Sequence, residues 1–290
     1  MSVVRSLQGK VVLITGATGG IGEVTARALA AHGATVVGVG RSPARCAAAA
    51  ERIRAASHAQ VEYLVADLSA QDQVRRVTAE FRRKYDRLDV LVNNAGALYN
   101  RRQESADGLE LTWALNHLGY FLLTQLLLDR LQAGAPARIV NVSSGAHLGG
   151  TLRFEDLEFK RGYNGWAAYA QSKLANVLFT YELARRLAGS GVTANALHPG
   201  FVATRFARNN GPLFNLAMGL AQRLGARTPE QGAATTIYLA ASPEVEGVTG
   251  QYFADGRVAP SSPASRDEAA ARRLWEVSEA MTREHAGQPA

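Results

Sequence analysis

Tyr169 and Lys173 are spaced so that they could move a proton together. Apolar residues recur every three or four positions behind them, so residues 167–187 are predicted to form one helix that carries both side chains on the same face. An ammonium close to a phenol stabilises the phenolate, and we expect Lys173 to lower the pKa of Tyr169 towards the range of an acid–base catalyst. The alternative is a solvated lysine beside an amphipathic tyrosine, so the surrounding elements must distinguish the two.

The chain begins with a strand, a glycine-rich turn and a helix, in the order that a dinucleotide-binding unit needs. Residues 10–15 are a β-branched run typical of a buried parallel strand, and residues 23–32 have helical character. Glycines between them let the backbone approach a pyrophosphate, and the helix N-terminus offers free N–H groups and a favourable dipole. The cofactor contacts predicted here are Gly16, Thr18, Gly19, Gly20, Ile21 and Gly22.

The second predicted strand, residues 35–40, is followed by Arg41. In NAD-binding folds an acidic residue at this position hydrogen-bonds the ribose 2′-hydroxyl, whereas an arginine suits a 2′-phosphate. Arg41 therefore favours NADP as the cofactor, with NAD as the other possibility. The alternative is that Arg41 is an ordinary surface charge.

Strands and helices continue to alternate along the chain. Five further strands are predicted at residues 61–66, 88–92, 138–142, 192–197 and 251–254, and further helices at 70–85, 108–131, 229–241 and 267–282. This alternation predicts an α/β Rossmann fold, with a doubly wound, mostly parallel seven-stranded sheet and helices on both faces.

Polar residues lie where several of these elements end. Asn94, Ala95 and Gly96 follow the strand at 88–92, where amides and glycine suit a turn against a flat ligand, although a plain turn is the alternative. Asn116 falls inside a predicted helix, where asparagine competes for backbone hydrogen bonds, so it is either exposed or placed for a purpose. Ser144 follows the strand at 138–142, and the glycine-containing loop after it could fold back over a site.

Two later segments stand apart from the sheet pattern. Residues 201–228 mix bulky apolar residues with a Gly-Pro breaker, which suggests a cover over an apolar substrate pocket, while ordinary core packing is the alternative. Residues 256–290 form a C-terminal extension with one helix. We found no linker that would divide the chain, so residues 1–290 are expected to form a single dinucleotide-binding and catalytic domain.

Bulk composition narrows the class of protein. The 290 residues are 47% apolar, which suffices for a sizeable core, and the net charge of +7 is carried by scattered arginines that give no support to nucleic-acid binding. Cys46 is the single cysteine and the six histidines lack ligand spacing, so we predict neither a disulfide framework nor a metal. Neither a signal peptide nor a long apolar run is present, so we expect a soluble cytoplasmic protein without a membrane anchor.

These motifs together resemble the short-chain dehydrogenase/reductase family. The matching stretches are TGATGGIG at residues 15–22, Asp67-Leu68, NNAG at 93–96, Asn116, Ser144, the Tyr169 to Lys173 motif, and Pro199-Gly200 with Thr204. More narrowly, LNHLGYF, RIVNVSS, AYAQSKLANVLFTYELARRL and ALHPGFVATRF are similar to the retinol dehydrogenase-like and WW-domain oxidoreductase-like branch.

The resemblance implies a role for each site residue. Tyr169 would exchange a proton with the substrate oxygen, and Lys173 would lower the pKa of that phenol and hydrogen-bond the nicotinamide ribose. Ser144 would hold the substrate oxygen, and Asn116 would position a water that links Lys173 to solvent. The further cofactor contacts implied are Asp67, Leu68, Asn94, Ala95, Gly96, Pro199, Gly200, Val202 and Thr204.

The expected reaction is hydride transfer between NADP and a small lipophilic alcohol, aldehyde or ketone of the retinoid, steroid or xenobiotic carbonyl type. Charge builds on oxygen in that reaction, and a phenol with a hydroxyl can stabilise it. An NADP-dependent epimerase or dehydratase shares the tyrosine and lysine but normally has a longer C-terminal substrate domain. A nucleotide-sensing regulator on the same scaffold is a second alternative, because a fold does not fix a function. A homo-oligomer is compatible with all three.

Overall fold

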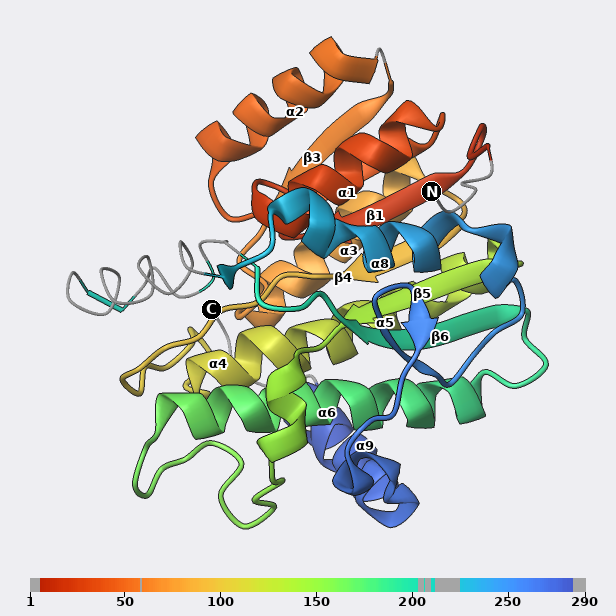
Figure 1. The fold of residues 1–290 in the computed structure, drawn as a ribbon. Coiled ribbons are helices and arrows are strands. Elements are labelled where there is room, and N and C mark those ends of the chain that lie inside the picture. Colours follow the sequence, from red (N-terminus) through yellow and green to blue (C-terminus); the bar gives the residue numbers. More distant parts are fainter. Residues whose placement is uncertain (1–5, 58, 203–205, 207–209, 212–224, 284–290) are drawn as a thin grey trace.

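The computed structural model describes residues 6–57, 59–202, 206, 210, 211 and 225–283 (Figure 1). All the strands among them join one sheet in the order β3-β2-β1-β4-β5-β6-β7-β8. They are β1 Val11–Thr15, β2 Thr35–Gly40, β3 Val61–Val65, β4 Val90–Asn93, β5 Ala137–Val142, β6 Val192–His198, β7 Tyr252–Ala254 and β8 Arg257–Val258. The pairings are parallel except between β7 and β8. The predicted doubly wound Rossmann sheet is confirmed.

The eighth strand was not predicted, because it consists of two residues after a tight turn. Asp255 and Gly256 both have positive φ, 51° and 69°, which is the backbone twist that a two-residue hairpin requires. An Asp-Gly pair is the usual sequence signal for such a turn. The hairpin adds one short antiparallel strand at the edge of the sheet, so eight strands stand where seven were expected.

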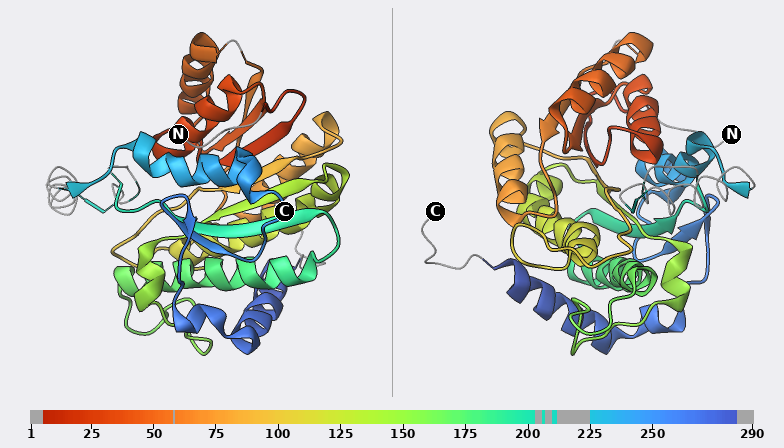
Figure 2. Two further views of the ribbon diagram at one scale, coloured as in Figure 1. Left: turned by 45° about the vertical axis from the view of Figure 1, so that its right-hand side comes forward. Right: turned by 90° about the vertical axis from the view of Figure 1, so that its left-hand side faces the viewer.

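Helices cover both faces of the sheet, as Figures 1 and 2 show. They are α1 Gly20–Ala31, α2 Pro43–Ser57, α3 Gln71–Lys84, α4 Leu111–Trp113, α5 Gly119–Ala133, α6 Gly165–Arg186, α8 Pro229–Ala241 and α9 Glu268–Thr282. Alternate residues of the strands point to opposite faces. Val12 and Ile14 share an apolar cluster with Leu29 of α1 and Leu239 of α8, whereas Leu13 belongs to the cluster on the other face.

Helix α2 is an element that the sequence pattern did not reveal. Its residues include a run of four alanines, and only Cys46, Ala49, Ala50 and Ile53 are buried. Such a helix has little apolar periodicity and is favoured by the high helix propensity of alanine instead. Among the described residues, no helix combines the length and apolarity needed to cross a membrane.

The helical part of the C-terminal extension lies on the outer side of α6 (Figure 2). It contains a short 3-10 turn, η4 (Pro263–Arg266), followed by α9. Trp275 of α9 packs its ring against Phe121 of α5 and Phe179 of α6, with centroid distances of 5.1 and 5.8 Å. The predicted covering segment, 201–228, falls mostly outside the described residues.

Candidate active site

A cavity of about 1170 Å³ opens at the carboxyl ends of the central strands. The strand order reverses between β1 and β4, and in doubly wound sheets ligands bind at this point. Seventeen of the predicted site residues line the cavity: Gly16, Thr18, Gly19, Gly20, Ile21, Gly22, Arg41, Leu68, Asn94, Ala95, Gly96, Ser144, Tyr169, Lys173, Pro199, Gly200 and Val202. Residues more than 180 positions apart in the chain therefore meet at one place.

The glycine turn between β1 and α1 leaves no room for side chains at two positions. A Cβ on Gly22 would lie 2.4 Å from the carbonyl oxygen of Gly16. Gly16 has a φ of 68°, which favours glycine, and its own Cβ would lie 3.0 Å from the Cα of Ala95. The Tyr63 hydroxyl donates to the Ala17 carbonyl over 2.7 Å, which links this turn to β3. The N-terminus of α1 is thus open to an anionic group such as a pyrophosphate.

Hydrogen bonds tie the Asn-Asn-Ala-Gly segment at the end of β4 to the neighbouring strands β1 and β5. The Thr15 Oγ1 accepts hydrogen bonds from the backbone N–H groups of Asn94 and Ala95, over 2.8 and 2.9 Å. The Asn94 side chain donates to the Thr15 carbonyl over 2.8 Å. Asn93 is fully buried and donates to Asn141 of β5. The turn therefore fixes β4 between its neighbours and leaves its outer surface to the cavity.

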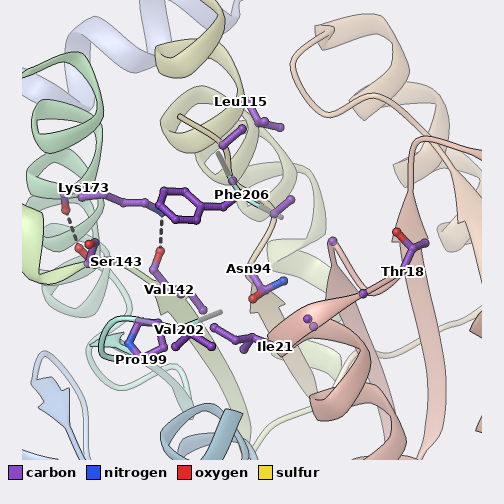
Figure 3. A pocket seen from close by; sticks show the side chains of 18 of the residues that line it. Thr18, Ile21, Asn94, Leu115, Val142, Ser143, Lys173, Pro199, Val202 and Phe206 are labelled. Atoms are coloured by element: carbon purple, nitrogen blue, oxygen red, sulfur yellow. Dashed lines mark hydrogen bonds between the residues drawn. The ribbon is translucent and has the colours of Figure 1, made fainter. Parts of the chain in front are cut away.

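Helix α6 brings Tyr169 and Lys173 to the cavity with one face, as predicted. Figure 3 shows Lys173 and its hydrogen bond to Val142. The Lys173 Nζ donates to the Val142 carbonyl over 3.0 Å and lies 5.7 Å from the centroid of the Tyr169 ring. The Ser143 hydroxyl donates to the Lys173 carbonyl over 2.7 Å, which anchors the end of β5 on α6. Ser144 follows directly, so its hydroxyl and the Tyr169 phenol share one corner of the cavity.

Burial controls the ionisation of this cluster. We expected a Tyr169 pKa below its usual value because of Lys173, but the net shift has the opposite direction. Burial raises the pKa of the Tyr169 phenol, and a hydrogen bond with Ser144 opposes the shift only in part. Burial also lowers the pKa of Lys173 to about 7. The sequence spacing showed that the two groups are close, but not that both are removed from water, where the charged form of each is disfavoured.

The buried ammonium predicts an unusual dependence of stability on pH. Below about pH 7 the folded and unfolded chains both carry the Lys173 proton, and the folded state bears the full cost of burying it. Above this pH the folded state loses the proton first, so stability rises until the unfolded lysine also titrates. We expect Lys173→Met to be more stable than wild type at acid pH, by up to a few kcal/mol at roughly 1.4 kcal/mol per pKa unit. That advantage in stability should shrink as the pH rises above about 7.

Urea unfolding at a series of pH values below and above pH 7 would measure the difference in the free energy of unfolding between wild type and Lys173→Met. Lys160→Met is a suitable control, because the Lys160 side chain is 65% exposed. Parallel pH profiles for wild type and Lys173→Met would contradict a buried ammonium at this position.

Asn116 lies behind the cavity wall in a π-helical turn, η1 (Ala114–Leu118). It is fully buried, and its Oδ1 accepts from the Ala97 N–H while its Nδ2 donates to the Ala97 carbonyl, both over 2.9 Å. Nδ2 also donates to the Ser172 hydroxyl over 3.0 Å. Such single π turns occur often at functional sites. Of the two interpretations drawn from the sequence, exposure is wrong and a placed side chain is what the structure has.

Arg45 was missed by the sequence reasoning. It lines the cavity near Arg41, and its Nη2 donates to the Thr18 carbonyl over 3.4 Å. The signal was present, because Arg45 is four residues beyond Arg41 in the first turn of the unpredicted helix α2. The end of β2 therefore carries two guanidinium groups and no acidic side chain. This arrangement suits an anionic group on a bound ribose.

Aromatic side chains form the cavity wall beside the corner that Ser144 and Tyr169 share. The Tyr169 ring lies 5.9 Å from Trp166 and 5.8 Å from Phe206, measured between centroids. Trp166 is 59% exposed and is also a residue that we missed, although it precedes Tyr169 by three positions on the same helical face. Phe206 belongs to the predicted covering segment, and its carbonyl accepts from the Leu98 N–H over 3.1 Å.

Three predicted residues are not found on the cavity wall. Asn116 lies behind it, as described above. The Asp67 carboxylate accepts hydrogen bonds from the backbone and hydroxyl of Ser69, over 3.0 and 2.7 Å, and so caps the turn after β3. Thr204 lies outside the described residues.

Comparisons with known proteins agree with this geometry. The family model for short chain dehydrogenases matches residues 10–212. Retinol dehydrogenase 14 of Mus musculus is 44% identical over 292 residues, which cover 95% of this chain and 86% of the mouse protein. A solved structure of an uncharacterized protein from Mycobacterium paratuberculosis superposes with a TM-score of 0.79 at 38% identity, covering 96% of this chain and 95% of that one. An active-site complex of RhlG from Pseudomonas aeruginosa with NADP has a TM-score of 0.69 at 31% identity, covering 87% and 97%.

Proposed function

This chain belongs to the short-chain dehydrogenase family, and we propose that it is an NADP-dependent oxidoreductase that interconverts a lipophilic alcohol and its aldehyde or ketone. The observation that carries the proposal is the corner of the cavity where Tyr169, Ser144 and Lys173 meet beside the glycine turn. The glycine turn, the N-terminus of α1 and the two arginines fit a phosphate-bearing dinucleotide. Such a cofactor, when bound, supplies the hydride acceptor or donor.

In the proposed mechanism, Tyr169 is the group that exchanges a proton with the substrate oxygen. Burial keeps its phenol protonated near neutral pH, so in the direction of carbonyl reduction it is ready to donate. The Ser144 hydroxyl, hydrogen-bonded with the phenol, would hold the same substrate oxygen and stabilise charge that develops there. In the direction of alcohol oxidation the phenol must first release its proton, and a charged Lys173 nearby would favour that release.

The substrate class follows from the walls of the cavity. Trp166, Phe201 and Phe206 line it, and Trp166 and Phe206 lie against Tyr169. Trp166 and Phe201 are substantially exposed. Apolar surface of this kind favours a lipophilic substrate. We propose that the segment at residues 201–228 covers this substrate, supported by the position of Phe206 against Tyr169. The mouse relative is named as a retinol dehydrogenase, which agrees with a lipophilic alcohol.

A substrate panel tests the proposed function. Lipophilic primary and secondary alcohols, aldehydes and ketones would be assayed with NADP(H) and with NAD(H), following the absorbance of the reduced nicotinamide. We expect turnover with apolar substrates and little with small polar ones such as glycerol. An absence of turnover with every alcohol and carbonyl compound, while the protein still binds NADP, would favour a nucleotide-sensing regulator instead.

Cofactor preference is a separate prediction, supported by Arg41 and Arg45. A hydrogen bond to a charged group contributes about 1.5–3 kcal/mol, so NADP should bind at least roughly tenfold more tightly than NAD. Arg41→Asp places a negative charge against the 2′-phosphate and restores the acid of NAD binders, so the preference should invert. Titration of both cofactors at fixed ionic strength measures this, because exposed charges are screened.

A matched control for this experiment is Arg83→Asp, which makes the same charge change at an exposed position of α3. It should leave both affinities unchanged. If wild type binds NAD as well as NADP, or if Arg41→Asp keeps the wild-type preference, the NADP assignment is wrong.

A further inference from the structure

Two fully buried histidines lie outside the cavity, and each bonds to a serine of the C-terminal extension. His147 is three residues after Ser144, and His117 directly follows Asn116. Both are 0% exposed. The proposed mechanism uses neither ring, yet each is attached to a turn that carries a predicted site residue, Ser144 or Asn116.

The ring of His147 joins the Ser144 turn to the extension. Its Nε2 accepts a hydrogen bond from the Ser262 N–H over 3.2 Å. A backbone N–H can only donate, so the proton of the neutral ring is on Nδ1, which donates to the Ser144 carbonyl over 2.8 Å. Burial lowers the pKa of His147, which keeps the ring in this neutral form. Tyr252 packs on the ring at 4.7 Å between centroids and limits its rotation.

The ring of His117 makes the corresponding link from the π turn. Its Nε2 lies 2.7 Å from the Ser278 Oγ on α9. The Ser278 hydroxyl proton is used by the Leu274 carbonyl, 2.7 Å away, so the His117 Nε2 carries the proton and donates. Trp113 lies against the same ring at 4.5 Å. The two histidines are therefore held in opposite tautomers, each set by its partner in the extension.

The described part of the extension, up to residue 283, is anchored to the core at two places, so it can act as a fixed support. The Tyr181 hydroxyl on α6 lies 2.8 Å from the Ser261 Oγ, just before η4. The Gln71 side chain on α3 donates to the Met281 carbonyl over 2.8 Å, near the end of α9.

We propose that the C-terminal extension holds the turns of Ser144 and Asn116 in their working positions through His147 and His117, which act as positioning residues. Ser144 must present its hydroxyl to the substrate oxygen, and Asn116 must hold the backbone of Ala97, which directly follows Gly96 at the Lys173 Nζ. The inference rests on the proposed function for the roles of these two residues. Its effect on their positions can be measured without turnover.

The first test compares two substitutions that each remove one hydroxyl group from α9. Ser278→Ala removes the partner of His117, whereas Thr282→Ala removes another buried hydroxyl from the same helix, one turn further on. The amide of Ala97 donates to the Asn116 Oδ1, so its hydrogen exchange reports on the Asn116 side chain. We expect Ser278→Ala to accelerate this exchange roughly tenfold and Thr282→Ala to leave it unchanged.

The second test isolates one N–H group at Ser262. Its φ of −61° matches the fixed φ of proline, so Ser262→Pro removes the hydrogen bond to His147 with a compatible backbone angle. Ser262→Ala is the control, because it removes the same hydroxyl but keeps the N–H. The amide of Ala146 donates to the Ser144 Oγ, and its exchange should rise in the proline variant alone.

Activity then separates positioning from plain loss of stability. Misplacement of catalytic groups by about 1 Å can cost on the order of 100-fold, so kcat should fall about 10- to 100-fold in Ser278→Ala and Ser262→Pro, with KM for NADP unchanged. Equal Ala97 exchange in Ser278→Ala and Thr282→Ala would overturn the inference, and this pair still decides it if Ser262→Pro does not fold. If exchange responds as expected but wild type turns over no substrate, the positioning holds and the proposed function falls.

Discussion

Tyr169→Phe is expected to lower kcat by about 10²–10⁴-fold, the usual contribution of general acid–base catalysis, while the fold and cofactor affinity stay close to wild type. The substitution removes only the phenolic oxygen. The ring keeps its packing between Trp166 and Phe206, so no core contact is lost. With the phenol gone, Lys173 cannot take its place, because its Nζ is directed to the Val142 carbonyl.

Steady-state kinetics with a lipophilic substrate, together with NADP binding followed by fluorescence, would measure both parts of this expectation. Tyr85→Phe is a suitable control, since its hydroxyl donates to Glu62 and Tyr85 does not line the cavity. Near-normal turnover in Tyr169→Phe, with a control that behaves like wild type, would remove Tyr169 from the proposed mechanism.

Gly22→Ala should abolish most cofactor binding through a single methyl group. The new Cβ would lie 2.4 Å from the Gly16 carbonyl oxygen and 2.6 Å from the Asn94 Nδ2. Neither neighbour can yield cheaply, because one is backbone and the other is hydrogen-bonded to Thr15. The glycine turn must therefore shift. The loss of two hydrogen bonds to a charged pyrophosphate, at about 1.5–3 kcal/mol each, would weaken NADP binding by at least about 100-fold.

Overpacking of this kind also costs about 1–3 kcal/mol of stability, which urea unfolding can measure beside the cofactor titration. Gly149→Ala is the control, because a Cβ there meets no atom within 4 Å. If Gly22→Ala binds NADP like wild type, the turn is more adaptable than its packing indicates, and the proposed pyrophosphate position is wrong.

Features that depend on the types and spacing of residues close together in the chain could be predicted from the sequence. The β-branched runs predicted the strands, and the spacing of Tyr169 and Lys173 predicted their shared face. Features that depend on neighbours distant in sequence were not readable. Helix α2 has no clear apolar stripe, and Arg45 acquired a meaning only when this helix placed it beside the Thr18 carbonyl.

The burial of individual side chains also could not be predicted from the sequence. The sequence identified Asn116 as unusual but could not show that its amide bonds to the backbone of Ala97. The same gap explains the wrong direction for the pKa of Tyr169. A lysine four residues away predicts a lower pKa, but the burial of the phenol, which depends on the whole fold, outweighs it.

The strand order has a consequence for synthesis on the ribosome. β1 is the first strand to be made, yet it lies in the middle of the sheet, paired with β2 on one edge and β4 on the other. Val12 of β1 pairs with Val90, so about 80 residues must be translated before that second edge is closed. At roughly 5–20 residues per second, the nascent chain carries an open, β-branched edge for several seconds. An unpaired apolar edge is a site of aggregation, so the growing chain is exposed to this hazard until β4 has been made.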